Sequence, residues 1–254
     1  MKYIHYYILF LFFFIACKES KTDINPCVPQ TKLDVPLEEV SGISSSFVDT
    51  VLFVKLQEPQ NTFRNLDKLK IYNDTIYILD ESLSKLMSFD KEGNFITQYG
   101  ERGRSGSEYV RVNSFDVDKH YVYLYDDASE KMISFTHGGE FVQKVETSFW
   151  GEDFKVLDDG SFLFSLKPGK TNVKLCMTDS LFNIKRCFLT LMRKTKTIYS
   201  GYSLFQKVGD SIYYTDDMSD TTHVFTPKGE LVHSYLFNFG KYAPPLEHVM
   251  MQNN

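Results

Sequence analysis

The segment YILDESLSKLMSFDKEGNFI at 77–96 is repeated in altered form at 123–142, as YLYDDASEKMISFTHGGEFV. An Asp, a Phe, a Gly and a second Phe recur between the two copies at one offset of 46 residues. A third copy lies 90 residues beyond the second, at Asp216, Phe225, Gly229 and Leu231. A β-rich repeat with a period in the forties is typical of a propeller blade. The repeat therefore predicts an all-β chain folded as a β-propeller with four-stranded blades.

Apolar alternation and turn residues predict four short strands in each of four blades. The first blade is expected at 66–71, 75–79, 85–89 and 95–99, and the second at 114–117, 121–125, 131–135 and 141–145. The third is expected at 154–157, 162–165, 173–177 and 184–190, and the fourth at 204–208, 211–215, 222–226 and 231–237. Residues 51–56 form a further expected strand, the outer strand of a closing blade. Gly93 stands in a hairpin turn, where a residue that adopts positive φ is needed.

The composition favours packed strands and argues against a nucleic-acid partner. The chain contains 22 Phe and 16 Tyr against 14 Gly and 8 Pro, an aromatic content that disordered chains lack. Its formal net charge is −5, and its basic residues form no patch of the kind that binds phosphate backbones.

The first 16 residues are predicted to be a lipoprotein signal peptide. Their apolar run, 3–16, is shorter than the roughly 20 residues that a spanning helix needs. Ala16 directly before Cys17 resembles the lipobox of bacterial lipoproteins, which predicts cleavage before Cys17 and lipidation of its thiol. The lipid would anchor the protein to a membrane. The alternative is an ordinary signal peptide; residues 17–32 are expected to be a polar tether and 33–254 the propeller.

The residue pattern of the repeat also resembles that of a known family. The pattern resembles NHL-type propeller repeats. In it, an Asp ends the second strand, an aromatic residue ends the third, and a turn with Gly-x-Phe follows. The glycine-rich run 100–109 is similar to the stretch that links neighbouring blades there. With the lipobox in front, the chain resembles the six-bladed β-propeller lipoproteins of Bacteroides and its relatives.

That resemblance implies six blades, but the chain after the tether accommodates fewer at about 45 residues each. We therefore expect an incomplete six-bladed ring with four to five blades visible, truncated at the C-terminal side relative to the family. A closed five-bladed ring is the alternative. Open edge strands would favour association with other chains.

Three repeated carboxylates, Asp80, Asp126 and Asp216, have two interpretations. Repeated carboxylates bind cations in some proteins. At the same turn of each blade, however, an Asp more often accepts backbone N–H bonds in an Asx-type turn, and we expect this structural role.

A ligand-binding face is expected on the loops at one mouth of the channel. Arg102 and Arg104 could bind carboxylates or phosphates through their guanidinium groups, with Glu108 and Tyr109 beside them. Alternatively, Glu108 pairs with an arginine and Tyr109 packs beneath the loop. Trp150, at the approach to the third blade, would either stack on a sugar or cap the core.

Cys176 and Cys187 flank the predicted last hairpin of the third blade and are a possible disulfide in an exporting compartment. The histidines show no paired spacing of the zinc-binding kind, and no nucleophile elbow or phosphate loop is present. We expect no catalytic, metal or cofactor site.

The sequence therefore predicts a lipid-anchored binding or scaffold module of the cell envelope. Its partner would be a glycan, a peptide or a protein, and as an outer-membrane lipoprotein it would face either the periplasm or the cell surface. The alternative function is an envelope hydrolase or lyase with its active site in the propeller channel, which would require converging acidic, histidine or asparagine side chains.

Overall fold

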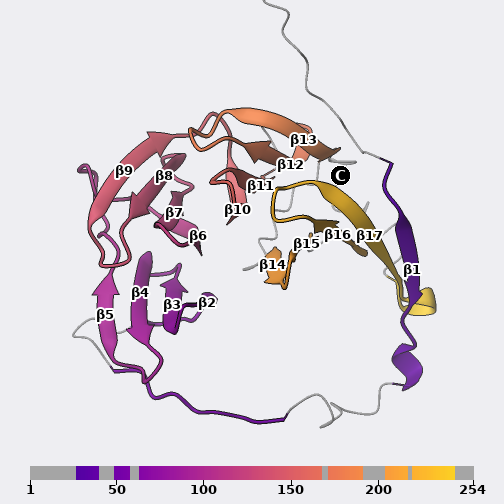
Figure 1. Cartoon of the computed structure of the whole chain (residues 1–254), viewed down its shortest axis with the longest axis horizontal. Helices are drawn as coiled ribbons and strands as arrows, with labels where there is room; N and C mark the ends of the chain where they lie inside the picture. Colours follow the sequence, from indigo (N-terminus) through magenta and orange to yellow (C-terminus); the bar gives the residue numbers. More distant parts are fainter. Residues whose placement is uncertain are drawn as a thin grey trace, which may run out of the picture.

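The computed structural model describes residues 27–39, 49–57, 63–167, 171–190, 204–216 and 219–243. These ranges contain 17 strands and two short 3-10 turns, η1 (Leu37–Glu39) and η3 (Gly240–Tyr242). Four β-sheets are arranged around a common centre (Figure 1). The predicted all-β propeller is thus confirmed, with four blades in the described part. Within these ranges, no helix has the length and apolar character needed to cross a membrane.

Each blade consists of four consecutive strands. Blade 1 contains β2 (Lys68–Tyr72), β3 (Thr75–Asp80), β4 (Lys85–Asp90) and β5 (Phe95–Gln98). Blade 2 contains β6 (Val112–Val117), β7 (Val122–Asp126), β8 (Lys131–Phe135) and β9 (Phe141–Glu146). Blade 3 contains β10 (Gly151–Val156), β11 (Phe162–Leu166), β12 (Val173–Thr178) and β13 (Ile184–Thr190). Blade 4 contains β14 (Phe205–Val208), β15 (Ser211–Thr215), β16 (Thr221–Phe225) and β17 (Leu231–Asn238).

The first strand of every blade lies nearest the centre, and the last lies at the rim (Figure 1). A fifth strand, β1 (Gln30–Asp34), pairs in parallel with β17 at the outer edge of blade 4. Asn238 Nδ2 donates a hydrogen bond to Asp34 Oδ1 over 2.6 Å. Blades 1 and 4 are the two ends of an open arc, and the segment 49–57 runs along the open side (Figure 1).

The sixteen predicted blade strands occur in the predicted order, and all but one lie within two residues of their predicted bounds, whereas β1, which begins inside the predicted tether, was not predicted. The inner strand of blade 3 begins at Gly151, because Glu152 and Asp153 are buried in ion pairs rather than exposed in a loop. The predicted strand at 51–56 is wrong, since residues 51–57 form no ladder. Instead, Gln57 N donates to Gly93 O over 2.7 Å, and Leu56 packs on the outward face of blade 1.

The repeated aspartates tie successive loops to the blades. Asp126 Oδ2 accepts a 2.7 Å hydrogen bond from Val110 N, and its Oδ1 accepts a 3.1 Å bond from Arg111 N. Asp80 accepts from the backbone of residues 64 and 65 in the same way. Both carboxylates also accept from the turn that follows them. The structural interpretation is confirmed for these two, whereas Asp216 pairs with Lys174 at 3.4 Å.

The other repeated positions build the turns and the core. Gly93, Gly139 and Gly229 adopt φ of +89°, +90° and +80°, the left-handed conformation that favours glycine in these hairpins. The repeated Phe89, Phe135 and Phe225 are almost fully buried. Aromatic and aliphatic clusters fill the spaces between neighbouring blades. Burial of these faces is what fixes each blade against the next.

Cys176 of β12 and Cys187 of β13 are directly opposite each other in the antiparallel ladder. Both are free thiols in this structure, with Cys176 buried and Cys187 half-buried. Opposed residues have Cβ atoms about 4.5–5.5 Å apart, and a disulfide needs about 3.5–4.5 Å. A small approach of the two strands would therefore allow the bond, and the predicted disulfide stays a prediction.

We expect the protein secreted through an oxidising compartment to carry the Cys176–Cys187 bond, which would raise the free energy of unfolding by about 2–3 kcal/mol. Mass spectrometry of non-reduced peptides should find the cross-linked pair. The Cys187→Ser variant is the control and should lose the gain. Two free thiols in the secreted wild-type protein would contradict the prediction.

Candidate ligand-binding cavity at the centre of the propeller

The inner strands carry charged side chains that alternate along each strand. Lys68 and Lys70 are two positions apart on β2, and Asp153 and Lys155 are two apart on β10. Side chains two positions apart on a strand lie on the same face of the sheet. Asp116 of β6 completes this set, which we call the hub cluster: Lys68, Lys70, Asp116, Asp153 and Lys155.

Asp153 connects all four inner strands. Its Oδ1 is 2.6 Å from Lys68 Nζ of β2 and accepts a 2.5 Å hydrogen bond from Ser114 Oγ of β6. Its Oδ2 accepts a 2.9 Å bond from the backbone N–H of Leu204, directly before β14. Burial alone would raise the pKa of Asp153, but the Lys68 ammonium and these hydrogen bonds outweigh it and hold the pKa below its usual value.

Asp116 holds two lysines at once. Lys155 Nζ lies 2.6 Å from its Oδ2, and Lys70 Nζ forms an ion pair with its Oδ1. The backbone N–H groups of Val117 and Val156 also donate to this carboxylate, each over 2.8 Å. β2, β6 and β10 are thereby joined a second time.

The hub cluster has three ammonium groups and two carboxylates. The side chains of Lys68 and Lys155 are 8% and 7% exposed, whereas that of Lys70 is 26% exposed. Burial, followed by the nearby ammonium groups of Lys155 and Lys68, lowers the pKa of Lys70 well below its ordinary value. Burial also lowers the pKa of Lys155. Lys70 is therefore the accessible member of a group with excess positive charge.

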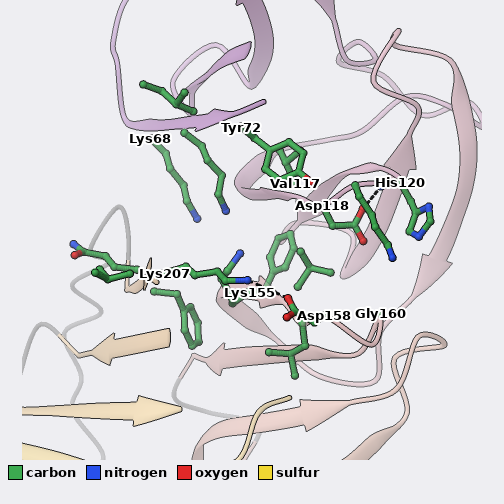
Figure 2. Close-up of a pocket in the computed structure, with 18 of the residues that line it drawn as sticks. Lys68, Tyr72, Val117, Asp118, His120, Lys155, Asp158, Gly160 and Lys207 are labelled. Atoms are coloured by element: carbon green, nitrogen blue, oxygen red, sulfur yellow. Dashed lines mark hydrogen bonds and ion pairs between the residues drawn. The ribbon is translucent and has the colours of Figure 1, made fainter. Parts of the chain in front are cut away.

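The three lysines of the hub cluster line a central cavity of about 1110 Å³. Its walls come from β2, from the end of β6 and the following turn, from β10 and from β14. Figure 2 shows Lys68 extending from β2, while Lys155, Lys207 and Asp158 gather on the facing side. Lys207 Nζ is 3.0 Å from Asp158 Oδ1. Exposed Leu69, Ile71 and Val208 add apolar surface to the same space, so that the cavity combines apolar walls with ammonium groups.

Residues 36–254 match the domain of unknown function DUF4934. The chain belongs to the DUF4934 family. No curated protein matches its sequence.

Among solved structures, the DUF4934 chain is similar to a Bacteroides fragilis protein provisionally described as exported, at 23% identity and a TM-score of 0.68. That match covers 84% of this chain and 61% of the other, so the chain spans about three fifths of the length of that relative. Virginiamycin B lyase from Staphylococcus aureus matches at 12% identity and a TM-score of 0.45, over 65% of this chain and 53% of the lyase. BamB from Moraxella catarrhalis matches at 10% identity and a TM-score of 0.49, over 76% of this chain and 56% of BamB. The first similarity shows the propeller fold, and the weaker two carry no argument about function.

The opposite mouth of the DUF4934 propeller has a different charge arrangement. Asp127 accepts two bonds from the Arg111 guanidinium, at 2.6 and 2.7 Å, and a third from Lys167 Nζ at 2.6 Å. Lys167 Nζ lies 5.2 Å from the centroid of the Trp150 ring. Burial, with Asp67 and Asp127 nearby, raises the pKa of Glu81 to about 7. Trp150 thus stacks with a lysine at this mouth, and its proposed contact with a sugar stays a prediction.

The predicted ligand loop lies away from the central cavity. Tyr109 is fully buried in the core between blades 1 and 2, which agrees with the interpretation that it packs beneath the loop. Glu108 accepts a 2.7 Å hydrogen bond from Ser105 N, and Lys144 of the outer strand β9 contacts Glu108 O. Arg102 and Arg104 are in the same loop and do not line the cavity. Cys17 is outside the described residues, so its lipidation stays a prediction.

The sequence analysis did not find the hub cluster, because each of its charged residues is flanked on at least one side by apolar residues of a predicted strand and forms no recognisable motif. The signal was present, since charges two positions apart on predicted inner strands, as at Lys68 and Lys70, point to one face. In the described part of the chain, no group of three His, Cys, Asp or Glu side chains could hold a metal ion. The cavity lining combines lysine ammonium groups with the carboxylates of Asp118, Asp158 and Asp159 and the imidazole of His120.

We expect Asp153→Asn to lower the free energy of unfolding by about 3–5 kcal/mol, because it leaves Lys68 buried and unpaired. Urea unfolding at pH 7 measures the loss. Asp158→Asn is the matched control: its pair with Lys207 is exposed and should contribute less than about 1 kcal/mol.

The pH dependence provides a second check on the same variant. The pKa of Asp153 is lower in the folded state than in the unfolded state. Its contribution to the free energy of unfolding is therefore complete above the unfolded-state pKa of about 3.9 and is lost as the pH falls through the folded-state pKa. The wild-type protein should therefore lose more stability than Asp153→Asn on acidification. Equal losses would contradict this role.

Proposed function

We propose that this propeller is an exported binding module that takes a small ligand with a carboxylate or phosphate group into its central cavity. The observation that carries the proposal is the three-to-two excess of ammonium groups over carboxylates in the hub cluster, beside a cavity of about 1110 Å³. An anion near Lys70 would balance this excess in a partly desolvated site, where charge-assisted hydrogen bonds are strong.

Several of the other charges that line the cavity are already engaged, and we propose Lys70 as the principal contact. Lys207 is paired with Asp158, and Asp118 accepts backbone N–H bonds from residues 120 and 121. Lys70 shares Asp116 with Lys155, so its ammonium group retains donors for a ligand. Acidic ends of glycan or peptide fragments have the required chemistry.

Binding should be measured by isothermal titration calorimetry with inorganic phosphate and succinate at pH 7, and with glycerol as the uncharged comparison. We expect Lys70→Met to weaken binding of both anions by about tenfold or more, because a charge-assisted contact contributes about 1.5–3 kcal/mol. The fold should survive, since Lys155 still pairs with Asp116.

Lys91→Gln, in the exposed β4–β5 hairpin, removes the same charge outside the cavity and should leave binding unchanged. Anion binding should also weaken as the pH rises, because Lys70 must be protonated to donate its full charge. Equal affinity of the wild-type protein and Lys70→Met for both anions would refute the proposed site.

We further propose that the protein is held in the cell envelope by a lipid on Cys17. The apolar run and Ala16-Cys17 support this, as does the similarity to a relative provisionally described as exported. Metabolic labelling with a palmitate analogue should mark the wild-type protein and not Cys17→Ser. Protease treatment of intact cells would then separate a surface location from a periplasmic one, and absence of label from the wild-type protein would refute the anchor.

A further inference from the structure

Lys70 occupies an unusual position among the lysines of the propeller. It lies in the middle of the inner strand β2, lines the central cavity and is 26% exposed. Its neighbours Lys68 and Lys155 also border the cavity, but they are less than a tenth exposed. Lys70 is therefore the amine of the hub cluster that a solute in the cavity can reach.

The ammonium groups of Lys155 and Lys68 disfavour the protonated form of Lys70, whereas the Asp153 carboxylate favours it. Asp116 of β6 is its ion-pair partner, but Lys155 of β10 shares that carboxylate. Asp153 of β10 is engaged by Lys68, the other lysine of β2. Asp118, His120, Asp158, Asp159, Lys119 and Lys207 also line the cavity.

Two ammonium groups on one carboxylate repel each other, and loss of one proton relieves that repulsion. Removing a proton from the hub cluster leaves two ammonium groups for two carboxylates. The proton should come from Lys70, because burial and the flanking Lys155 and Lys68 lower its pKa. A lysine beside other cationic groups is a known means of producing a neutral, nucleophilic amine near neutral pH.

We propose that Lys70 is a reactive amine that forms an imine with aldehyde- or ketone-bearing molecules entering the central cavity. The nitrogen lone pair attacks the carbonyl carbon while the carbonyl oxygen takes up a proton. The resulting carbinolamine loses its hydroxyl group as water, with loss of the second nitrogen proton, and a C=N bond remains. One amine and one carbonyl compound thus give one imine and one water, without an oxidant or reductant.

This reactivity is separate from the anion binding proposed above and has the opposite pH dependence. Anion binding needs the protonated Lys70, whereas addition to a carbonyl needs the neutral amine. A neutral aldehyde therefore tests the amine without relying on the anion site.

The experiment treats the full chain with propanal and sodium cyanoborohydride between pH 6 and 10, and follows alkylation of each lysine by peptide mass spectrometry. Each unit by which a lysine pKa falls raises its neutral fraction near pH 7 about tenfold. We expect Lys70 to be alkylated at least tenfold faster than exposed Lys91 and Lys228 at pH 7. A rate at Lys70 no higher than at those two lysines would overturn the proposal.

A matched pair of variants tests the electrostatic cause. Lys155→Met removes the ammonium group that shares Asp116, so the pH at half-maximal alkylation of Lys70 should rise. Lys155→Arg keeps the positive charge and should keep the wild-type profile. A merely structural role of Lys155 would leave the profile of folded Lys155→Met unchanged, and that result would overturn the assigned cause. Should Lys155→Met not fold, the wild-type rates and Lys155→Arg still decide the proposal.

Discussion

Two buried carboxylates hold the centre of this propeller together. Asp153 reaches β2 through Lys68, β6 through Ser114 and the entry to β14 through Leu204 N. Asp116 joins β2, β6 and β10 a second time. Blades interact mainly with their neighbours, so contacts that cross several inner strands set the geometry of the whole arc. Charged groups buried this deeply are tolerated only because each carboxylate is saturated with donors.

The outer parts of the blades depend on simpler local chemistry. Asp80 and Asp126 bind the loop that enters their own blade, and the repeated glycines form the outer hairpins. These contacts recur at fixed offsets because each blade has the same hairpin turns and the same kind of entering loop. The centre does not repeat in this way: β2 contributes two lysines, β6 an aspartate and β10 one residue of each charge. The centre of the propeller is therefore asymmetric, whereas the outer parts of the blades repeat.

The periodicity of the sequence made the blades predictable. The pairing of distant strands and the charged groups at the centre were not predictable in this way. Asp126, Phe135 and Gly139 repeat Asp80, Phe89 and Gly93, so alternation and turns located the strands between them. The start of β10 was missed because Glu152 and Asp153 look solvated until partners on other blades are known. The segment 51–56 is an apolar run typical of a strand, but it pairs with no neighbouring strand in a ladder. Conversely, β1 is polar, and only its pairing with β17 makes it a strand.

The pairing of β1 with β17 has a consequence for the order of folding. The Asp34–Asn238 hydrogen bond joins residues 204 positions apart, whereas contacts within each blade link neighbours along the chain. Closing so long a loop costs chain entropy that local hairpins avoid, and contacts of high sequence separation form slowly. Blades can therefore assemble one after another as the polypeptide emerges from the ribosome, whereas β1 must wait until β17 has been made. Until then, β1 lacks the strand with which it pairs.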